Sequence, residues 1–143
     1  MIIYIGSDHA GFELKQQLSA YLTVNGYACL DKGTHTTASC DYPDYAHAVA
    51  HAVSEQPEAL RGVLICGSGQ GVMMTANKHP NARAALAWTP EIATLARQHN
   101  DANILCLPAR FIDTENAINC LRLFLETPFE GGRHTLRTAK IDL

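Results

Sequence analysis

The residue combination with the clearest chemical potential is a cysteine that directly precedes a glycine-rich loop, in the segment Cys66-Gly67-Ser68-Gly69-Gln70-Gly71. Glycines at alternate positions allow positive φ angles and let a ligand approach the backbone closely. Successive backbone N–H groups at the start of a helix bind anionic oxygen, and a thiol placed there is stabilised as the thiolate. The segment therefore predicts an anion-binding loop, with Cys66 at its edge as a base or nucleophile.

Residue types at the end of this loop exclude three common anion-binding motifs. A Walker P-loop ends in Gly-Lys-Ser/Thr, whereas Gly71 is followed by Val72. A dinucleotide fingerprint has the spacing GxGxxG, whereas this loop has GxGxG. A cysteine phosphatase loop would carry an arginine where this chain has Val72. The remaining alternative to an anion-binding loop is a tight turn from a strand to a helix, with Cys66 as a buried apolar residue.

A second polar segment, Ser7-Asp8-His9, follows an apolar run near the N-terminus. An Asp-His pair at the end of a strand can hold the hydroxyls and ring oxygen of a sugar, or it can hold an anion. The alternative is structural, with Asp8 capping the next helix and His9 in a loop without a ligand. The segment by itself leaves both interpretations open.

His99 and Asn100 belong to a polar cluster, residues 97–101, that precedes the last predicted strand. A histidine can move protons near neutral pH, and an asparagine side chain can bond two oxygens. In a parallel sheet, residues that precede a strand lie at the opposite edge from residues that follow one. We therefore expect His99 and Asn100 to serve a neighbouring subunit, in an active site shared between two chains.

The C-terminal segment 128–143 is basic, although the chain as a whole is acidic. Arg133 and Arg137 are four residues apart, so a helical tail would present both on one face. Guanidinium groups are the preferred partners of phosphate, and Arg110, after the last predicted strand, is a further candidate. The alternative interpretation is a charged tail that is only solvated.

Two further patterns do not predict a metal site. His47 and His51 have the i, i+4 spacing of metal ligands, but no HExxH motif and no obvious third ligand accompany them, so they predict an ordinary helix face. The five cysteines form no CxxC pair, which argues against a zinc knuckle or a thioredoxin-type motif. Several of the cysteines lie in apolar runs, which predicts reduced thiols in the cytoplasm.

Short apolar runs alternate along the chain with segments of helical periodicity. The runs predict five strands, at residues 2–5, 27–30, 62–66, 83–87 and 103–107. Apolar spacing predicts helices over 12–22, 46–53 and 72–78, and the capping residues Thr89 and Asp113 predict the starts of two more. Buried strands that alternate with helices predict one three-layer, Rossmann-like α/β domain with a parallel sheet, and ligands then bind beyond the carboxyl ends of the strands.

Length and composition exclude several classes of protein. The chain has 143 residues, which predicts a single domain over 1–143. A hydrophobic content of 47% with only 17% charged residues excludes intrinsic disorder. The net charge of −3 argues against a nucleic-acid partner. No apolar run is long enough to span a membrane, and the N-terminus lacks the features of a signal peptide, so no membrane association is expected.

Seven short segments occur in the order that is typical of one family. They are Ser7-Asp8-His9-Ala10-Gly11-Phe12, Asp31-Lys32-Gly33, Asp41-Tyr42-Pro43, Cys66-Gly67-Ser68-Gly69-Gln70-Gly71, Ala76-Asn77-Lys78, Gln98-His99-Asn100-Asp101 and Glu130-Gly131-Gly132-Arg133-His134. Over nearly its full length the chain resembles the ribose-5-phosphate isomerase B family, which also includes galactose-6-phosphate isomerase subunits. The resemblance implies a homodimer or a dimer of dimers, with active sites at the subunit interface. It also implies interconversion of ribose 5-phosphate and ribulose 5-phosphate without a metal or other cofactor.

The resemblance assigns three catalytic residues. Cys66 would be the base that moves a proton between C2 and C1, and His99 would assist opening of the furanose ring. Ser68 stands where many members have threonine and would help to move hydroxyl protons. Another branch of the family lacks the cysteine and has a glutamate directly after the loop. Here that position is Val72, which cannot take a proton, so Cys66 is the only credible base in the loop.

The remaining residues that the resemblance assigns would bind the substrate. Asp8 and Tyr42 would contact the sugar near its ring oxygen and hydroxyls. The backbone from Gly67 to Gly71, together with Asn100, would hold the oxygens of the enediolate. The phosphate would be bound by basic side chains, namely His9, Arg110, Arg133 and Arg137, with the tail at 128–143 completing that site.

Two alternatives to this function remain at the level of the sequence. The first is isomerisation of a hexose 6-phosphate, such as allose or galactose 6-phosphate, by the same chemistry. The second is a non-catalytic module that binds a phosphosugar. Such a module could keep Arg133 and Arg137 but would not need Cys66 and His99, so the presence of both favours an enzyme.

Overall fold

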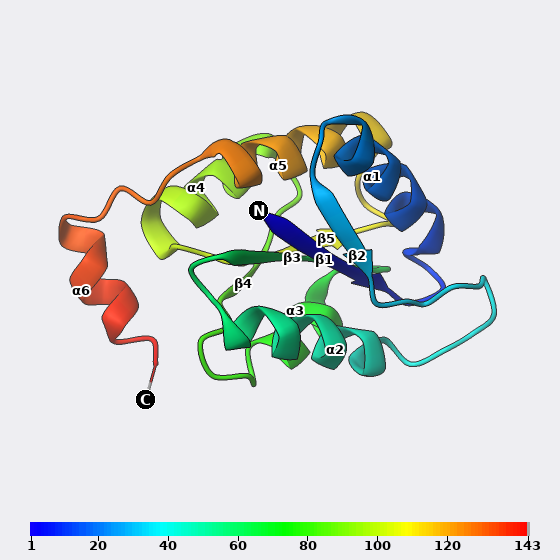
Figure 1. Ribbon diagram of the computed structural model, residues 1–143, viewed down its shortest axis with the longest axis horizontal. Coiled ribbons are helices and arrows are strands. Elements are labelled where there is room, and N and C mark those ends of the chain that lie inside the picture. The colour runs from blue at the N-terminus through cyan, green and yellow to red at the C-terminus, as the bar shows by residue number, and fades with distance from the viewer. Residues whose placement is uncertain (143) are drawn as a thin grey trace.

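Five short apolar strands form one parallel sheet in the computed structural model, which describes residues 1–142 (Figure 1). They are β1 (Ile2–Ser7), β2 (Ala28–Asp31), β3 (Leu60–Cys66), β4 (Ala84–Leu86) and β5 (Ile104–Pro108). The order across the sheet is β2-β1-β3-β5-β4, so the direction of winding reverses between β1 and β3. Small ligands bind at such a reversal, beyond the carboxyl ends of the strands. The predicted five-stranded parallel α/β fold is confirmed.

Helices cover both faces of the sheet and form the outer two layers (Figure 1). One face is covered by α1 (Phe12–Val24), α4 (Pro90–Asn100) and α5 (Thr114–Glu126), and the other by α2 (Tyr42–Glu55) and α3 (Gln70–Ala76). A sixth helix, α6 (Arg133–Ala139), stands away from these layers at the C-terminal end. None of the helices in residues 1–142 combines the length and apolar character needed to cross a bilayer.

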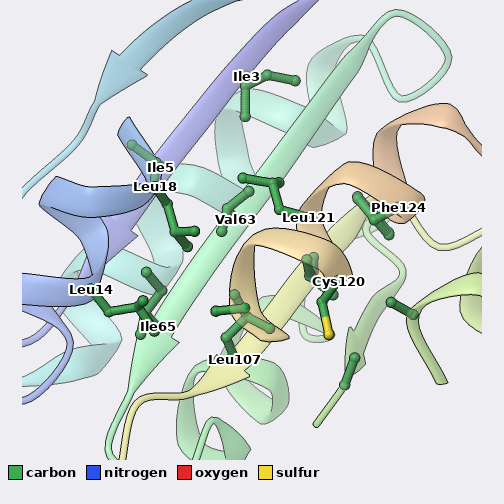
Figure 2. Packing of buried hydrophobic residues seen from close by; sticks show 14 of the residues in the cluster. Ile3, Ile5, Leu14, Leu18, Val63, Ile65, Leu107, Cys120, Leu121 and Phe124 are labelled. Atoms are coloured by element: carbon green, nitrogen blue, oxygen red, sulfur yellow. The ribbon is translucent and has the colours of Figure 1, made fainter. Parts of the chain in front are cut away.

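The central strand β3 divides the core into two clusters. Val63 and Ile65 point into the cluster beneath α1, α4 and α5, which Figure 2 shows. Leu64 and Cys66 point the other way, into the cluster beneath α2 and α3. Because β3 is buried on both faces, its sequence is an unbroken apolar run from Gly62 to Cys66, which is the pattern expected of an internal parallel strand, and only Arg61 near its start is charged. Each fully buried aliphatic side chain contributes about 1.5–3 kcal/mol.

The starts of two helices are fixed by side-chain caps. The hydroxyl of Thr89 accepts a hydrogen bond from the backbone N–H of Ile92 at 3.3 Å, at the start of α4. The carboxylate of Asp113 accepts one from the N–H of Asn116 at 2.7 Å, at the start of α5. Both caps agree with the sequence prediction. Helix α4 then continues to Asn100, so the predicted polar cluster forms its last turn.

The chain between α5 and α6 leaves the body of the molecule and returns to the end of α4. Gly131 and Gly132 have φ angles of 68° and 56°, a region that favours glycine, and they turn the chain into α6. His134 and Thr138 on α6 are buried, whereas Arg133 and Arg137 are exposed. The basic tail is therefore an ordered helix that is held against α4 on one face only.

Candidate active site

Cys66 is the last residue of β3 and is 5% exposed. The backbone N–H of Gly69 donates a hydrogen bond to its Sγ at 3.2 Å, so the loop holds the sulfur at the start of α3. Gly69 has a φ of 74°, and a side chain there would collide with Leu86. The loop closes around the thiol in this way because position 69 is a glycine.

Two side chains lie directly over the glycine loop. A Cβ on Gly71 would collide with the ring of Tyr42, and a Cβ on Gly67 would lie 3.3 Å from the guanidinium of Arg110. Tyr42 comes from the first residue of α2, and Arg110 from the loop after β5. The glycines therefore let a phenol and a guanidinium approach the backbone beside Cys66.

These groups line one cleft, which we call the thiol pocket. Its volume is about 380 Å³, within the range of pockets that bind small molecules. Most of the residues assigned from the sequence meet there, and Phe111 is the one lining residue that the sequence analysis did not name. The lining residues are Asp8, Tyr42, Cys66, Gly67, Ser68, Gly71, Arg110 and Phe111.

Asp8 and His9 lie at the end of β1, beside the thiol pocket. Asp8 is 7% exposed, and its carboxylate accepts a hydrogen bond from the backbone N–H of Gly11 at 3.1 Å. It therefore stabilises the turn before α1, whose N-cap is Gly11, and it also lines the pocket. His9 is half-buried, and its Nδ1 accepts a hydrogen bond from the N–H of Cys40 at 3.3 Å. His9 does not line the thiol pocket in the single chain.

Three of the other sequence-assigned residues, His99, Asn100 and Arg137, line a second cleft, which we call the imidazole pocket. It lies between the end of α4 and α6, has a volume of about 380 Å³, and is lined by His99, Asn100, His134, Arg137, Thr138 and Ile141. The rings of His99 and His134 stack, with centroids 4.3 Å apart and planes inclined by 13°. Arg133 is on the same helix as Arg137 but does not line either pocket.

The surroundings of His134 lower the pKa of its imidazole. Desolvation lowers the pKa of His134, and the positive charges of His99 and Arg133 lower it further. The carboxylate of Glu130 acts in the opposite direction, with its Oε2 at 3.6 Å from Nε2 of His134. From the sequence, His134 is recognisable only as part of the basic tail, because nothing in the sequence shows that the tail folds back onto α4.

The two pockets lie at opposite edges of the sheet within one chain. Cys66 pairs with Pro108 at the carboxyl ends of β3 and β5, whereas α4 ends beside the start of β5 at Ile104. The step from Ile104 to Pro108 alone spans about 13 Å. The structure thus separates His99 from Cys66, as expected for a residue that precedes a strand.

The remaining cysteines and histidines lie outside both pockets. Burial raises the pKa of Cys120 to about 11, and burial followed by the charge of Cys66 raises the pKa of Cys106 well above the usual range for a thiol. Both are core residues without a role in proton transfer at neutral pH. His47 meets a partner that the sequence did not reveal, since its Nδ1 lies 2.7 Å from Nε2 of His79.

The fold and the two pockets define an α/β protein whose parallel sheet is covered by helices on both faces. One cleft of small-molecule size lies beyond the carboxyl ends of the strands, and another lies at the opposite end. A family model described as Ribose/Galactose Isomerase matches residues 3–141. The chain belongs to this ribose/galactose isomerase family.

Relatives with known names are similar to the chain over nearly its whole length. It is 46% identical to the probable ribose-5-phosphate isomerase B of Mycoplasma pneumoniae, covering 97% of this chain and 91% of that protein. It is 42% identical to the ribose-5-phosphate isomerase B of Escherichia coli, covering 97% and 93% of the two chains. The matched regions cover almost all of each chain.

Solved structures give the same result. A Mycoplasma genitalium ribose-5-phosphate isomerase B with bound ribulose 5-phosphate has a TM-score of 0.96 at 43% identity, covering 98% of this chain and 93% of that one. The Thermotoga maritima ribose 5-phosphate isomerase has a TM-score of 0.95 at 48% identity, covering 99% and 97%. Both chains share the fold of this protein from end to end.

Proposed function

We propose that this protein is an aldose–ketose isomerase that interconverts ribose 5-phosphate and ribulose 5-phosphate through an enediolate. The observation that carries the proposal is the thiol pocket, where a buried cysteine is held by a backbone N–H among a carboxylate, a phenol and a guanidinium. Its membership in the ribose/galactose isomerase family supports the same reaction. So does its identity to relatives named ribose-5-phosphate isomerase B.

Cys66 is the base in this mechanism. As the thiolate, it removes the proton from C2 of the open-chain aldose and returns a proton to C1, while Ser68 helps to move the hydroxyl proton from O2 to O1. Proton transfer by a positioned side chain contributes about 10²–10⁴-fold. The backbone N–H groups from Gly67 to Gly71, with Asn100, hold the enediolate oxygens, and each well-placed donor contributes about 3–4 kcal/mol. The carbon skeleton is neither oxidised nor reduced overall, so no redox cofactor is required.

The opening of the furanose ring needs a second group, which we assign to His99. His99 exchanges a proton with the ring oxygen, while Asp8 and Tyr42 contact the sugar hydroxyls. Phosphate is bound by basic side chains around the cleft, which are His9, Arg110, Arg133 and Arg137. The exposed positions of Arg133 and Arg137 on α6 support a role in binding, because neither guanidinium has an acidic partner within salt-bridge distance in residues 1–142.

The complete site forms between two subunits, with the thiol pocket of one chain facing His99 of the partner subunit. Two-fold pairing of the same surface creates two identical sites in a homodimer, and a pair of dimers would contain four. Large apolar side chains that are exposed in the single chain supply contact surface, including Met74 at 59%, Trp88 at 52% and Phe111 at 73% exposure. Segment 128–143 then completes the phosphate site. The five free thiols support a reducing compartment, the cytoplasm.

Solvent exchange tests the assignment of the base. The C5 hydroxyl of ribulose 5-phosphate is blocked by phosphate, so this ketose forms no furanose ring and its exchange does not need ring opening. In deuterium oxide with a chelator present, the wild type should incorporate deuterium at C1 of ribulose 5-phosphate. The His99→Asn variant should retain this exchange, and the Cys66→Ala variant should lose it. Cys29→Ala, which changes a thiol outside both pockets, is the matched control, and undiminished exchange in Cys66→Ala would refute the assignment.

A substrate panel tests the choice of sugar. We expect kcat/KM for ribose 5-phosphate to exceed the values for allose 6-phosphate and galactose 6-phosphate. A higher value for either hexose phosphate would assign the same chemistry to a longer sugar. Binding of sugar phosphates without proton exchange would instead indicate a non-catalytic phosphosugar-binding protein.

A further inference from the structure

We propose that His99, Glu130 and His134 form a binding site for a divalent transition-metal ion, of which Zn²⁺ is the best fit, and that occupancy of this site inhibits the isomerase. The ligand atoms of these three residues lie within 4.8 Å of one another. Two histidines and one carboxylate are a ligand set that zinc sites use, with the fourth position left to water or another ligand. The inhibitory part of this inference rests on the function proposed above for His99.

The three groups are almost in place for a shared ion. Bonds of about 2.1 Å to one tetrahedral zinc put two ligand atoms about 3.4 Å apart. Oε2 of Glu130 and Nε2 of His134 are already 3.6 Å apart. The rings of His99 and His134 stack with centroids 4.3 Å apart, so one ring must turn out of the stack for both lone pairs to reach one ion. The remaining separations between ligand atoms, which are at most 4.8 Å, would close by rotation of the half-buried His99 ring and the exposed Glu130 side chain.

The backbone holds this arrangement together. The N–H of Glu130 donates a hydrogen bond to the carbonyl oxygen of Gln98 at 3.1 Å, which fixes the loop next to His99. The N–H of His134 donates to the carbonyl oxygen of Gly131 at 3.0 Å, which fixes the first turn of α6. The ligands therefore come from three elements, the end of α4, the loop and α6, whose relative positions are set before any ion binds.

The charges around the site favour moderate affinity and a particular kind of ion. Glu130 contributes one negative charge, whereas Arg133 and Arg137 are close enough to act on His134 and oppose a cation. Imidazole ligands suit Zn²⁺, Cu²⁺ and Ni²⁺, while Mg²⁺ and Ca²⁺ prefer oxygen. We therefore expect inhibition by zinc and none by magnesium at the same concentration.

Zinc would inhibit the enzyme because it would occupy the nitrogen lone pair that His99 needs for proton transfer. An imidazole nitrogen that is bonded to zinc cannot also take or give a proton at that atom. A metal ion on His99 would therefore stop proton exchange with the ring oxygen of the substrate. Removal of the ion by a chelator should restore activity, because no covalent bond in the protein has changed.

Two other places in the chain could bind zinc, and both serve as controls. His47 and His79 form an exposed imidazole pair with a separation of 2.7 Å between nitrogens. The thiol of Cys66 is the other competitor, because thiolates bind zinc strongly. His79→Asn removes the first competitor without touching either pocket. Substituted Co²⁺ reports on the second, because a cobalt–thiolate bond produces a charge-transfer band that nitrogen and oxygen ligands do not.

The experiment titrates the full-length enzyme with ZnCl₂ and follows both ribose 5-phosphate turnover and calorimetric binding. With each rate normalised to the variant's own zinc-free activity, we expect Glu130→Gln to need at least about tenfold more zinc for half-inhibition, since even loss of an outer-shell partner costs about 10–100-fold in affinity. His79→Asn should lose a binding event but keep the inhibition midpoint of the wild type. The cobalt-substituted protein should show no thiolate band.

Three outcomes would overturn the inference: an unchanged midpoint in Glu130→Gln, loss of inhibition in His79→Asn, or a thiolate band with cobalt. Failure of the proposed function is distinguishable from these, because calorimetry measures binding without turnover. A chain that binds zinc in a Glu130-dependent manner but isomerises no sugar phosphate would retain the metal site and lose the proposed enzyme activity.

Discussion

The thiol pocket and the imidazole pocket are built in different ways. The thiol pocket forms around backbone at the end of an internal strand, with Cys66 buried in a core cluster and held by the N–H of Gly69. The imidazole pocket consists of side chains between the end of α4 and a helix that stands away from the sheet. The first is fixed by the packing of the fold, whereas the second depends on how α6 is held. Under the proposed function, the rigid thiol pocket abstracts the proton from carbon, and the peripheral imidazole pocket contributes ring opening and part of the phosphate site.

Subunit complementation tests this division most severely. Cys66→Ala and His99→Asn should each lower turnover of ribose 5-phosphate by about 10²–10⁴-fold, because each removes a proton-transferring group. If the pockets combine across subunits, one site in each mixed dimer keeps both groups. When equal amounts of the two variants exchange subunits at random, half of the dimers are mixed and each has one intact site. About a quarter of wild-type activity should then be restored.

The control for complementation is the double variant Cys66→Ala/His99→Asn mixed with wild type, which leaves no intact site in a mixed dimer. In an equal mixture of these two proteins, activity should fall toward a quarter of that of the same total amount of wild type, because only a quarter of the dimers then consist of two wild-type chains. No recovery on mixing the two single variants, with subunit exchange verified by mass spectrometry, would place both groups in one chain.

Gly71→Ala adds only one methyl group, but it should strongly disturb the thiol pocket. A methyl group at this position collides with the ring of Tyr42, so the phenol or the loop must move. Displacement by about 1 Å near reacting atoms can cost about 10²-fold, and we expect a fall of that order in kcat/KM. Thermal unfolding of Gly71→Ala, Tyr42→Ala and the double variant forms a cycle that isolates the collision. Additive effects on stability would show that the two side chains do not meet.

Arg137→Ala should affect the imidazole pocket and leave the thiol pocket unchanged. Its guanidinium lines the imidazole pocket and is exposed, so its loss should weaken phosphate binding without unfolding the chain. A hydrogen bond to a charged group is worth about 1.5–3 kcal/mol, which corresponds to a rise of about 10–100-fold in KM. Lys140→Ala, an exposed cation after the same helix, is the matched control. Equal KM values for the two variants would remove Arg137 from the phosphate site.

The smallest of the expected effects is a pH dependence of stability, and it should come from His134 in the imidazole pocket. The pKa of His134 is lowered in the folded chain by desolvation and by its cationic neighbours. The unfolded state therefore binds more protons below about pH 6.5, and stability falls as the pH decreases through that value. We expect the decrease in Tm between pH 7 and pH 5 to be smaller in His134→Gln than in the wild type. His35→Gln, in an exposed loop, should leave the decrease unchanged.

The sequence was most informative about the rigid pocket. An unbroken apolar run predicted β3, and the glycines after it predicted a loop that the structure places over the thiol. The caps Thr89 and Asp113 predicted two helix starts correctly, because capping is a local interaction between neighbouring residues. Local chemistry of this kind can be recognised without knowledge of the rest of the chain.

The peripheral pocket was harder to predict because it depends on the path of the chain. One feature of the thiol pocket was also missed: apolar periodicity indicated the buried stripe of α2 from residue 46 onward, but the helix begins at Tyr42, whose ring faces the glycine loop. The stacking of His134 on His99 depends on the route of residues 127–132, which no spacing in the sequence encodes. The same reason applies to the contact of His47 with His79.

The separation of Cys66 from His99 along one sheet has a consequence for how the protein works in solution. Under the two-subunit arrangement, an isolated chain holds two half-sites and no complete catalytic centre. Specific activity should then decline when the enzyme is diluted below the dissociation constant of its dimer, and it should return on concentration. The concentration of the chain in a cell would thus affect the rate in two ways, through the total amount of enzyme and through the fraction of chains that are assembled into dimers.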